Sequence, residues 1–189
     1  MIPAFIELLR VDNMMVVEQA VWALGCIGAD NTAFRDQIIT EGGVQNLLRA
    51  LKKSEKKGSV NNACWALSNL ARGIPLPTYE LVKEIIETFC KMLSEGKIQD
   101  EETLGDCFWA IANHTDSDTK SALLKEAKFI TRIIMYIASS EMYANLVPSI
   151  RILGNATMGN DAGIDLMLEQ DVFSVLINML DHNRKVIRR

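Results

Sequence analysis

The stretch of sequence that decides the fold is Asn61-Asn62-Ala63-Cys64-Trp65-Ala66-Leu67-Ser68-Asn69-Leu70-Ala71-Arg72, in which an Asn follows a Trp after four residues. Related pairs recur at Trp22 and Cys26, Trp109 and Asn113, and Arg151 and Asn155. The first residues of the four pairs are separated by 43, 44 and 42 residues. A period in this range is typical of stacked helical repeats. We therefore expect an array in which each repeat contributes one such helix.

Composition supports a helical protein with a substantial core. The 189 residues are 49% hydrophobic, with a mean hydropathy of +0.09, so the chain has enough apolar material to fold. Only four Pro and eleven Gly interrupt a sequence rich in helix-forming residues, which predicts an all-helical structure with few long loops. The sequence has no uncharged apolar run of about 18 residues, so we expect no membrane span.

Charge and cysteine usage narrow the functional classes. A net charge of −4 and a pI near 5.3 argue against nucleic-acid binding and favour basic partners. The run 52–58 is basic but has no interleaved aromatic residues, so we interpret it as a solvated loop. The four cysteines lack C-x-x-C spacing and are expected to be reduced and structural. The amino terminus resembles no secretory signal, so we expect an intracellular protein.

Apolar periodicity and helix-breaking residues divide the chain into long, short and medium helices that recur in order. The helices are expected at 2–10, 16–29, 32–40, 44–53, 59–72, 79–93, 100–115, 119–127, 129–138, 143–158, 160–169 and 172–180, with the start of another at 184–189. Both ends of the chain fall within a repeat, whereas a solenoid normally ends in polar-faced repeats. We therefore expect one domain at 1–189, with about four repeats truncated at both ends. Exposed apolar faces at those ends would favour self-association.

The recurring long helices predict a ladder of side chains along one face. Such helices pack about 8 to 10 Å apart, and residues four apart lie on the same face of a helix. Each repeat can thus present a Trp ring and, one turn later, an Asn amide. An extended peptide advances about 3.3 Å per residue, so roughly three of its residues match one repeat step.

The chemistry of this ladder suits a basic peptide. An Asn side chain can pair with a peptide amide and carbonyl, and would be costly to bury in every repeat without a partner. A Lys or Arg stem fits between Trp rings, and its charged head gains about 0.5 to 2 kcal/mol of cation–π attraction. The candidate acids at the rim are Asp30, Glu102, Asp106 and Asp116. Each of these could instead be a helix cap or a solvated charge.

At these residues the sequence resembles the armadillo domain of the importin alpha family. The matching stretches are 18–25 with 34–36, 62–73 with Pro75 and Pro77, 106–111 with 115–116, and 148–155, which resemble the third to sixth repeats. The resemblance covers essentially the whole chain. It implies an all-α, right-handed superhelical solenoid of armadillo repeats, with three helices in each repeat.

The resemblance also implies a function, the binding of Lys/Arg-rich nuclear localisation signals in an extended, antiparallel course. Arg72 and Arg151 sit where the family interrupts its Trp ladder, and Asp161 lies at the margin of the smaller peptide site. The implied peptide-binding residues are the slot-forming Trp22, Trp65 and Trp109, the backbone-clamping Asn62, Asn69 and Asn113, the lysine-binding Asp30, the neighbouring Gln19, Glu102 and Asp106, and Arg151 with Asn155.

The partners implied are cargo proteins with basic localisation signals, met in the cytoplasm and the nucleus. Importin beta and the export receptor would engage the full-length protein only. We expect no cofactor, no metal site, no nucleic acid and no membrane as partners.

The sequence departs from the family at several positions. Cys26 stands where an Asn is expected. The absence of that amide clamp should weaken peptide binding by about 0.5 to 1.5 kcal/mol. Asn113 replaces a residue that is aromatic in many members and partly restores a clamp. The turns at Lys128 and Asp171 lack the usual Gly.

Two other functional classes were weighed against this interpretation. Enzyme activity finds little support, because only His114 and His182 are present and neither has the spacing of a metal-ligand motif. An armadillo scaffold that binds another protein partner is the stronger alternative. An acidic ladder would favour the import adaptor, and a basic ladder would favour the scaffold.

Overall fold

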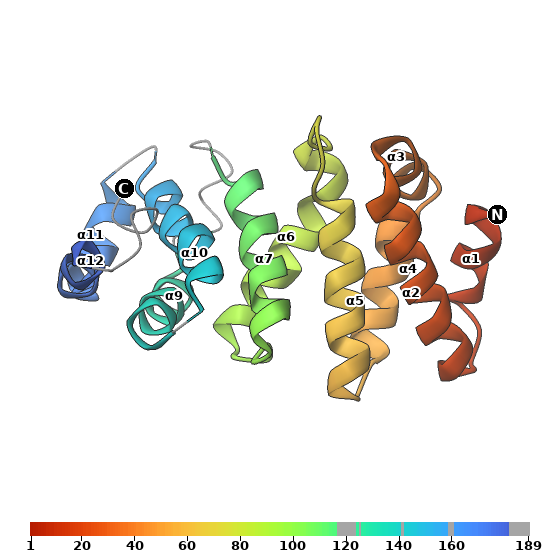
Figure 1. Ribbon diagram of the computed structural model, residues 1–189, viewed down its shortest axis with the longest axis horizontal. Coiled ribbons are helices and arrows are strands. Elements are labelled where there is room, and N and C mark those ends of the chain that lie inside the picture. Colours follow the sequence, from red (N-terminus) through yellow and green to blue (C-terminus); the bar gives the residue numbers. More distant parts are fainter. Residues whose placement is uncertain (117–123, 125, 141, 159–160, 182–189) are drawn as a thin grey trace. The chain divides into compact units, whose positions relative to one another are not determined.

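The computed structural model describes residues 1–116, 124, 126–140, 142–158 and 161–181 (Figure 1). Helices are the regular elements of this part of the chain, and it contains no strand. The helices are α1 (Ile2–Leu8), α2 (Met14–Asp30), α3 (Thr32–Thr40), α4 (Gly43–Lys53), α5 (Lys57–Leu70), α6 (Tyr79–Ser94), α7 (Glu101–His114), α9 (Ala127–Ser139), α10 (Tyr143–Ala156), α11 (Ala162–Glu169) and α12 (Val172–Leu180).

These bounds confirm the all-α class, and each helix lies within a few residues of its expected range. The expected helix at 119–127 falls mostly outside the described residues, as does the expected start of a helix at 184–189. Contacts between Cα atoms group the chain into two compact units, Met1–Ile86 and Glu87–Arg189. The division falls within α6, and each unit is described by itself.

In the first unit, α2 and α5 lie side by side and α4 packs beside α5 (Figure 1). Helical spacing places the small and aliphatic residues of α2 on one buried face, including Ala20, Leu24 and Gly28. Asn13 begins α2 by accepting hydrogen bonds from the amides of Met15 and Val16. The opposite face of α2 is left exposed, and it carries the residues expected in the ladder.

A buried guanidinium fixes the chain that follows α5. The side chain of Arg35, on α3, is 2% exposed, and its Nη1 donates to the carbonyl oxygens of Arg72 and Pro75 at 2.7 Å each. Its Nε donates to Asp36 at 2.8 Å, so the charge is paired as well as hydrogen-bonded. Because a buried charge is costly unless fully satisfied, these contacts hold the end of α5 against α3.

In the second unit, α7 and α10 lie side by side in the same way that α2 and α5 do, and α9 packs against α10. The rings of Phe108 and Tyr136 meet edge to face, with centroids 4.9 Å apart. Asn145, on α10, donates to the carbonyl oxygen of Glu101 at 2.7 Å. Hydrogen bonds and aromatic packing therefore both join the start of α7 to the helices that follow it.

The two turns that lack Gly behave differently. Asp171 precedes α12 with a φ of 51°, so its backbone is in the left-handed region although it is not a glycine. Gly42 holds the corresponding place before α4, with φ of 80°. Lys128 lies inside α9, where no left-handed residue is needed. The missing Gly thus strains the chain at Asp171 only.

Candidate functional site

The outward faces of α2 and α5 form a seam that carries the exposed polar and aromatic side chains of the first unit. We call it the α2–α5 seam, and its members among the predicted site residues are Gln19, Trp22, Asp30, Asn62 and Trp65, whereas Asn69 of α5 is buried. Trp22 is 55% exposed, an unusual state for so large an apolar ring. The burial of small residues on the other face of α2 is what leaves Trp22 outside.

Trp65 lies directly on the backbone of α2. A Cβ built on Gly25 would be 2.4 Å from Cζ3 and 2.9 Å from Cε3 of the Trp65 ring, distances that side chains do not adopt. The absence of a side chain at Gly25 therefore lets the ring pack against α2. Trp65 is half-buried as a result, while Trp22 remains open.

The first hollow of the seam, next to Trp22, has a volume of about 420 Å³. Its charged side chain is Glu18, which accepts a hydrogen bond from the hydroxyl of Ser59. The hollow is lined by Glu18, Gln19, Trp22, Gly58, Ser59 and Asn62. An aromatic ring, one carboxylate and two amides thus face the same space.

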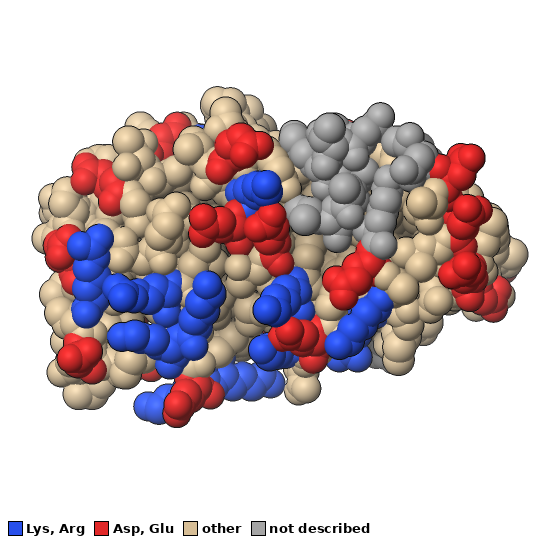
Figure 2. All heavy atoms as spheres, turned by 180° about the vertical axis from the view of Figure 1, so that it is seen from behind, with Lys and Arg blue, Asp and Glu red and all other residues tan. Residues whose placement is uncertain are grey.

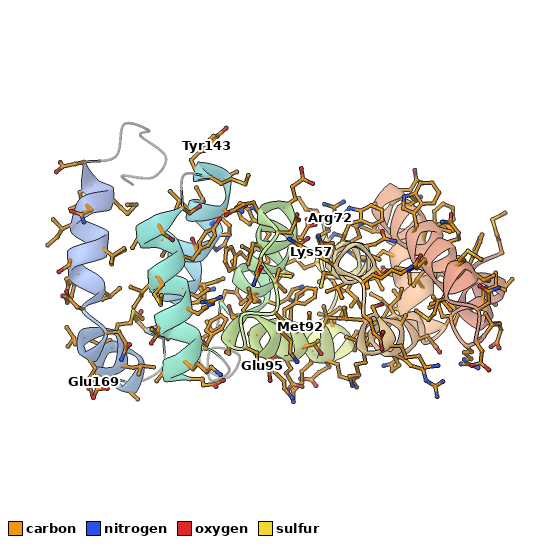
Figure 3. The ribbon with its side chains drawn as sticks, turned by 90° about the horizontal axis from the view of Figure 1, so that it is seen from below. Lys57, Arg72, Met92, Glu95, Tyr143 and Glu169 are labelled. Carbon is orange, nitrogen blue, oxygen red and sulfur yellow. The ribbon has the colours of Figure 1, made fainter. Side chains whose placement is uncertain are left out.

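The second hollow lies at the other end of the seam and has a volume of about 320 Å³. Asp30 reaches it from α2, and its Oδ2 accepts from Nδ2 of Asn31 at 2.9 Å. Arg35 and Arg72 also line it. The guanidinium of Arg35 already donates to the carbonyl oxygens of Arg72 and Pro75 and pairs with Asp36. Figure 3 labels Arg72, at the end of α5, and Lys57 at its start.

Asn69, which also belongs to the lining of the second hollow, stabilises the packing of α5 on α2. Its side chain has no exposed surface, and its Nδ2 donates to the carbonyl oxygen of Gly25 at 3.1 Å. Its Oδ1 is buried without a hydrogen-bond partner among the described residues. One side of the amide thus joins α5 to α2, and the other remains an unsatisfied acceptor.

Asn155 does the same in the second unit, where its Nδ2 donates to the carbonyl oxygen of Ala112 at 2.9 Å and to the hydroxyl of Thr115 at 3.1 Å. Both acceptors occupy the same position in their repeats. Gly25 directly precedes Cys26, and Ala112 directly precedes Asn113, and Cys26 and Asn113 are the second residues of their pairs. A hydrogen-bond partner within the chain therefore offsets the cost of burying these two amide groups. The partner is the neighbouring helix, and we call this contact the asparagine clip.

The remaining predicted residues lie along one stripe of α7 and in the second half of α10. Glu102 and Trp109 are exposed, Asp106 and Asn113 are half-buried, and Arg151 is exposed on α10. Their spacing of three or four residues places the α7 set on one face. They belong to the second unit and are a set separate from the α2–α5 seam.

Sequence reasoning missed two residues of the first hollow, Glu18 and Ser59. Glu18 precedes Trp22 by four residues, a spacing that places the carboxylate one turn below the ring. That spacing was the signal that could have identified it. Ser59 could not be found in this way, because its contact with Glu18 joins two different helices.

The described residues contain neither a cluster suited to a metal ion nor a helix suited to span a membrane. No group of three His, Cys, Asp or Glu side chains in them is arranged to hold a metal ion. None of the helices described is both long and apolar enough to cross a membrane.

Comparisons with known proteins agree with this architecture. The sequence profile described as Armadillo/beta-catenin-like repeat matches residues 1–25 and 31–72. Importin subunit alpha-1b of Oryza sativa subsp. japonica is 32% identical over 188 residues, and importin subunit alpha-3 of Arabidopsis thaliana is 33% identical over 185 residues. Each match covers 97% of this chain and 34% of the relative, so the chain spans about a third of their length.

Solved structures show the same fold at low sequence identity. A computationally designed armadillo repeat protein for modular peptide recognition aligns with a TM-score of 0.81 and 19% identity, covering 99% of this chain and 77% of the design. A designed armadillo repeat protein in complex with the peptide (KR)4 aligns with a TM-score of 0.78 and 20% identity, covering 98% and 77%. The repeating helices, the asparagine clips and these comparisons agree on the fold: the chain is an armadillo-repeat solenoid that is similar to importin alpha subunits over about a third of their length.

Proposed function

We propose that this chain is a peptide-binding adaptor segment that holds Lys/Arg-rich nuclear localisation signals in an extended conformation, with the α2–α5 seam as its centre. The observation that carries the proposal is the hollow beside Trp22, in which an exposed indole and the carboxylate of Glu18 face the same space. It is lined by no cationic side chain. Such a surface attracts a long apolar stem that ends in a positive charge.

The second hollow supports a cation of its own. Asp30 brings an exposed carboxylate to this hollow. An ammonium group offers three donors and can pair with that carboxylate. Arg72 is exposed at the edge of this hollow and disfavours a second positive charge there. We therefore expect one basic side chain in each hollow.

The exposed and the buried side chains among the predicted site residues have different roles in this proposal. Trp22, Gln19 and Asn62 present surface to a peptide, whereas Asn69 and Asn155 use their amide groups to hold neighbouring helices in register. In the second unit, the stripe that contains Glu102 and Trp109 offers the same combination of acid and indole. We propose that it receives further basic residues of the same class of peptide.

The relatives support this function without establishing it for the chain. Those that match 97% of it are named importin alpha subunits, and one design with the same fold was solved with a (KR)4 peptide. Traffic between cytoplasm and nucleus, and contact with importin beta and an export receptor, are proposed for a full-length protein of this kind. For this chain we propose a peptide-binding, non-enzymatic role.

The test is a titration of a fluorescent eight-residue (KR)4 peptide, followed by anisotropy at low and at physiological salt. Asp30→Lys should weaken binding by about tenfold or more, since it replaces an attraction by a repulsion. Trp22→Ala should weaken it about 2- to 30-fold through the lost cation–π contact. Affinity should fall as salt rises, because the attraction between charges is screened.

Two matched controls make the result specific to the seam. Glu84→Lys reverses an exposed acid on α6, and Phe34→Ala removes an exposed aromatic ring on α3. Neither residue lines the hollows of the seam, so each variant should bind within about twofold of the original chain. Equal losses in control and seam variants, or no loss in either, would refute the proposal and favour a scaffold with another protein partner.

A further inference from the structure

A second charged surface lies on the outer face of α4 and the turn that follows it. We call it the basic outer face, and it consists of the exposed Arg49, Lys52, Lys53, Lys56 and Lys57. Glu55 is the one acid in the stretch 49–57, which therefore carries +4 in a chain whose net charge is −4. The rest of the chain carries −8, so positive charge is concentrated in nine residues.

The fold turns these cations outward. Val44, Leu47 and Leu51 bury one face of α4, and helical spacing leaves Arg49, Lys52 and Lys53 on the other. Lys56 is the N-cap residue of α5, and Lys57 is its first residue. Figure 2, seen from behind, shows a group of Lys and Arg side chains over this unit.

These cations lack the ion pairs that other basic residues make. No described carboxylate forms an ion pair with any of the five. Arg10, by contrast, pairs with Glu7 at 3.0 Å, and Arg35 pairs with Asp36 at 2.7 Å. The five positive charges are therefore available to an anionic partner without breaking an ion pair among the described residues.

Helix stability explains only part of the cluster. Lys52 and Lys53 lie in the last turn of α4, where the helix dipole favours positive charge. Lys56 and Lys57 lie at the start of α5, where the dipole disfavours it, and the first turn of α5 contains no acid. The positive end of the α5 dipole adds to their charge. The arrangement is thus unfavourable for folding and favourable for binding an anionic group.

We propose that the basic outer face is a docking surface for an acidic, Glu/Asp-rich polypeptide segment of a partner protein. The chemistry favours this class over other polyanions. Single-stranded nucleic acid is usually held by aromatic stacking, and residues 45–58 contain no aromatic side chain. Membrane anchoring needs inserted apolar groups, and the described surface of 45–58 has no exposed large hydrophobic residue.

This surface differs from the α2–α5 seam in charge and in its residues, and the two meet at the start of α5, where Lys57 precedes Gly58 of the first hollow. In Figure 1 the seam helices α2 and α5 are seen in front of α4, whereas the positive side chains gather in the view from behind. The two surfaces attract peptides of opposite charge. The chain can therefore hold a basic peptide on one side and an acidic segment on the other at the same time.

The experiment compares two variants that remove equal charge. In the first, Lys52, Lys53, Lys56 and Lys57 are all changed to Gln; in the matched control, Lys83, Lys91, Lys97 and Lys128, which are exposed on α6, on α9 or beside α6, are changed to Gln. Binding of a fluorescent twelve-residue Glu/Asp peptide is measured by anisotropy at low salt, and circular dichroism confirms that both variants are folded. We expect the first variant to bind about tenfold more weakly and the control within about twofold of the original chain.

Three results would overturn the proposal: an equal loss in both variants, no loss in the first, or no measurable binding of the acidic peptide by the original chain. Stronger binding to phosphatidylserine vesicles or to oligo-dT than to the acidic peptide would contradict the class of partner. The (KR)4 titration serves as an independent readout, since the first variant should retain its affinity for that peptide. Retained (KR)4 binding with lost acidic-peptide binding separates this surface from the seam.

Discussion

The contact between Gly25 and Trp65 predicts a large difference between two glycine substitutions. In Gly25→Ala the new Cβ would lie 2.4 Å from Cζ3 of Trp65, about 1 Å closer than two carbon atoms normally approach. Relieving that overlap should cost about 1 to 3 kcal/mol. Ala also stabilises a helix by about 0.8 to 1 kcal/mol relative to Gly, so the net destabilisation should be about 0 to 2 kcal/mol.

Gly154→Ala, on α10, is the matched substitution. Nothing lies within 4 Å of a Cβ built at that helical glycine, so the variant gains the same helix propensity without an overlap. The difference in unfolding free energy between the two variants should therefore be about 1 to 3 kcal/mol. At roughly 2 to 4 °C per kcal/mol for a chain of this size, this corresponds to a difference in Tm of about 2 to 12 °C.

The assay is thermal and urea unfolding of both variants, followed by circular dichroism, with (KR)4 binding measured alongside. Gly25→Ala should also weaken peptide binding, because the displaced ring of Trp65 forms part of the seam. If both glycine variants were equally stable, or if Gly25→Ala were the more stable, the packing of Trp65 on α2 would be refuted.

Three further predictions follow from other contacts. Asn69→Ala should lower stability by about 1 to 3 kcal/mol in urea unfolding, because it removes the bond to the carbonyl of Gly25 and leaves a cavity; unchanged stability would contradict the asparagine clip. Asp171→Gly should raise the unfolding free energy by about 0.5 to 1 kcal/mol, and with it the Tm, because Gly accepts the left-handed conformation without strain. A fall in Tm would show that the turn is not strained. Burial raises the pKa of the Cys90 thiol from 9.0 to about 12, so the unfolded chain loses this proton first and stability should fall as the pH rises from about 9 towards 12. Urea titrations of the original chain and Cys90→Ala across that range should show a steeper fall in the original, and parallel curves would exclude the contribution of this thiol.

The period of the Trp and Asn pairs predicted stacked helical repeats, and the family resemblance specified the armadillo type. Three indoles at regular spacing identify the ladder helices, and apolar periodicity places the helices between them within a few residues. The exposure of Trp22 was also predictable, because the small residues of α2 that are buried define its opposite face.

The use of the asparagines could not be predicted from their position. Asn62 and Asn69 lie two turns apart on α5, yet Asn69 is fully buried and bonded to α2, while Asn62 is half-buried and lines a hollow. Whether an Asn side chain of α5 is buried depends on a carbonyl oxygen of another helix. The sequence of α5 alone therefore does not predict which Asn is buried. The same limit applies to Ser59, whose partner is Glu18 on α2.

The asparagine clips also give the array a direction. In each unit the amide of the later helix reaches back to a carbonyl of the earlier one, from Asn69 to Gly25 and from Asn155 to Ala112. A substitution at one Asn therefore loosens the joint that precedes it and leaves the following joint intact. Cys26 lacks a side-chain amide, yet this does not weaken the contact between α2 and α5. The hydrogen bond of that contact is donated by Asn69 of α5.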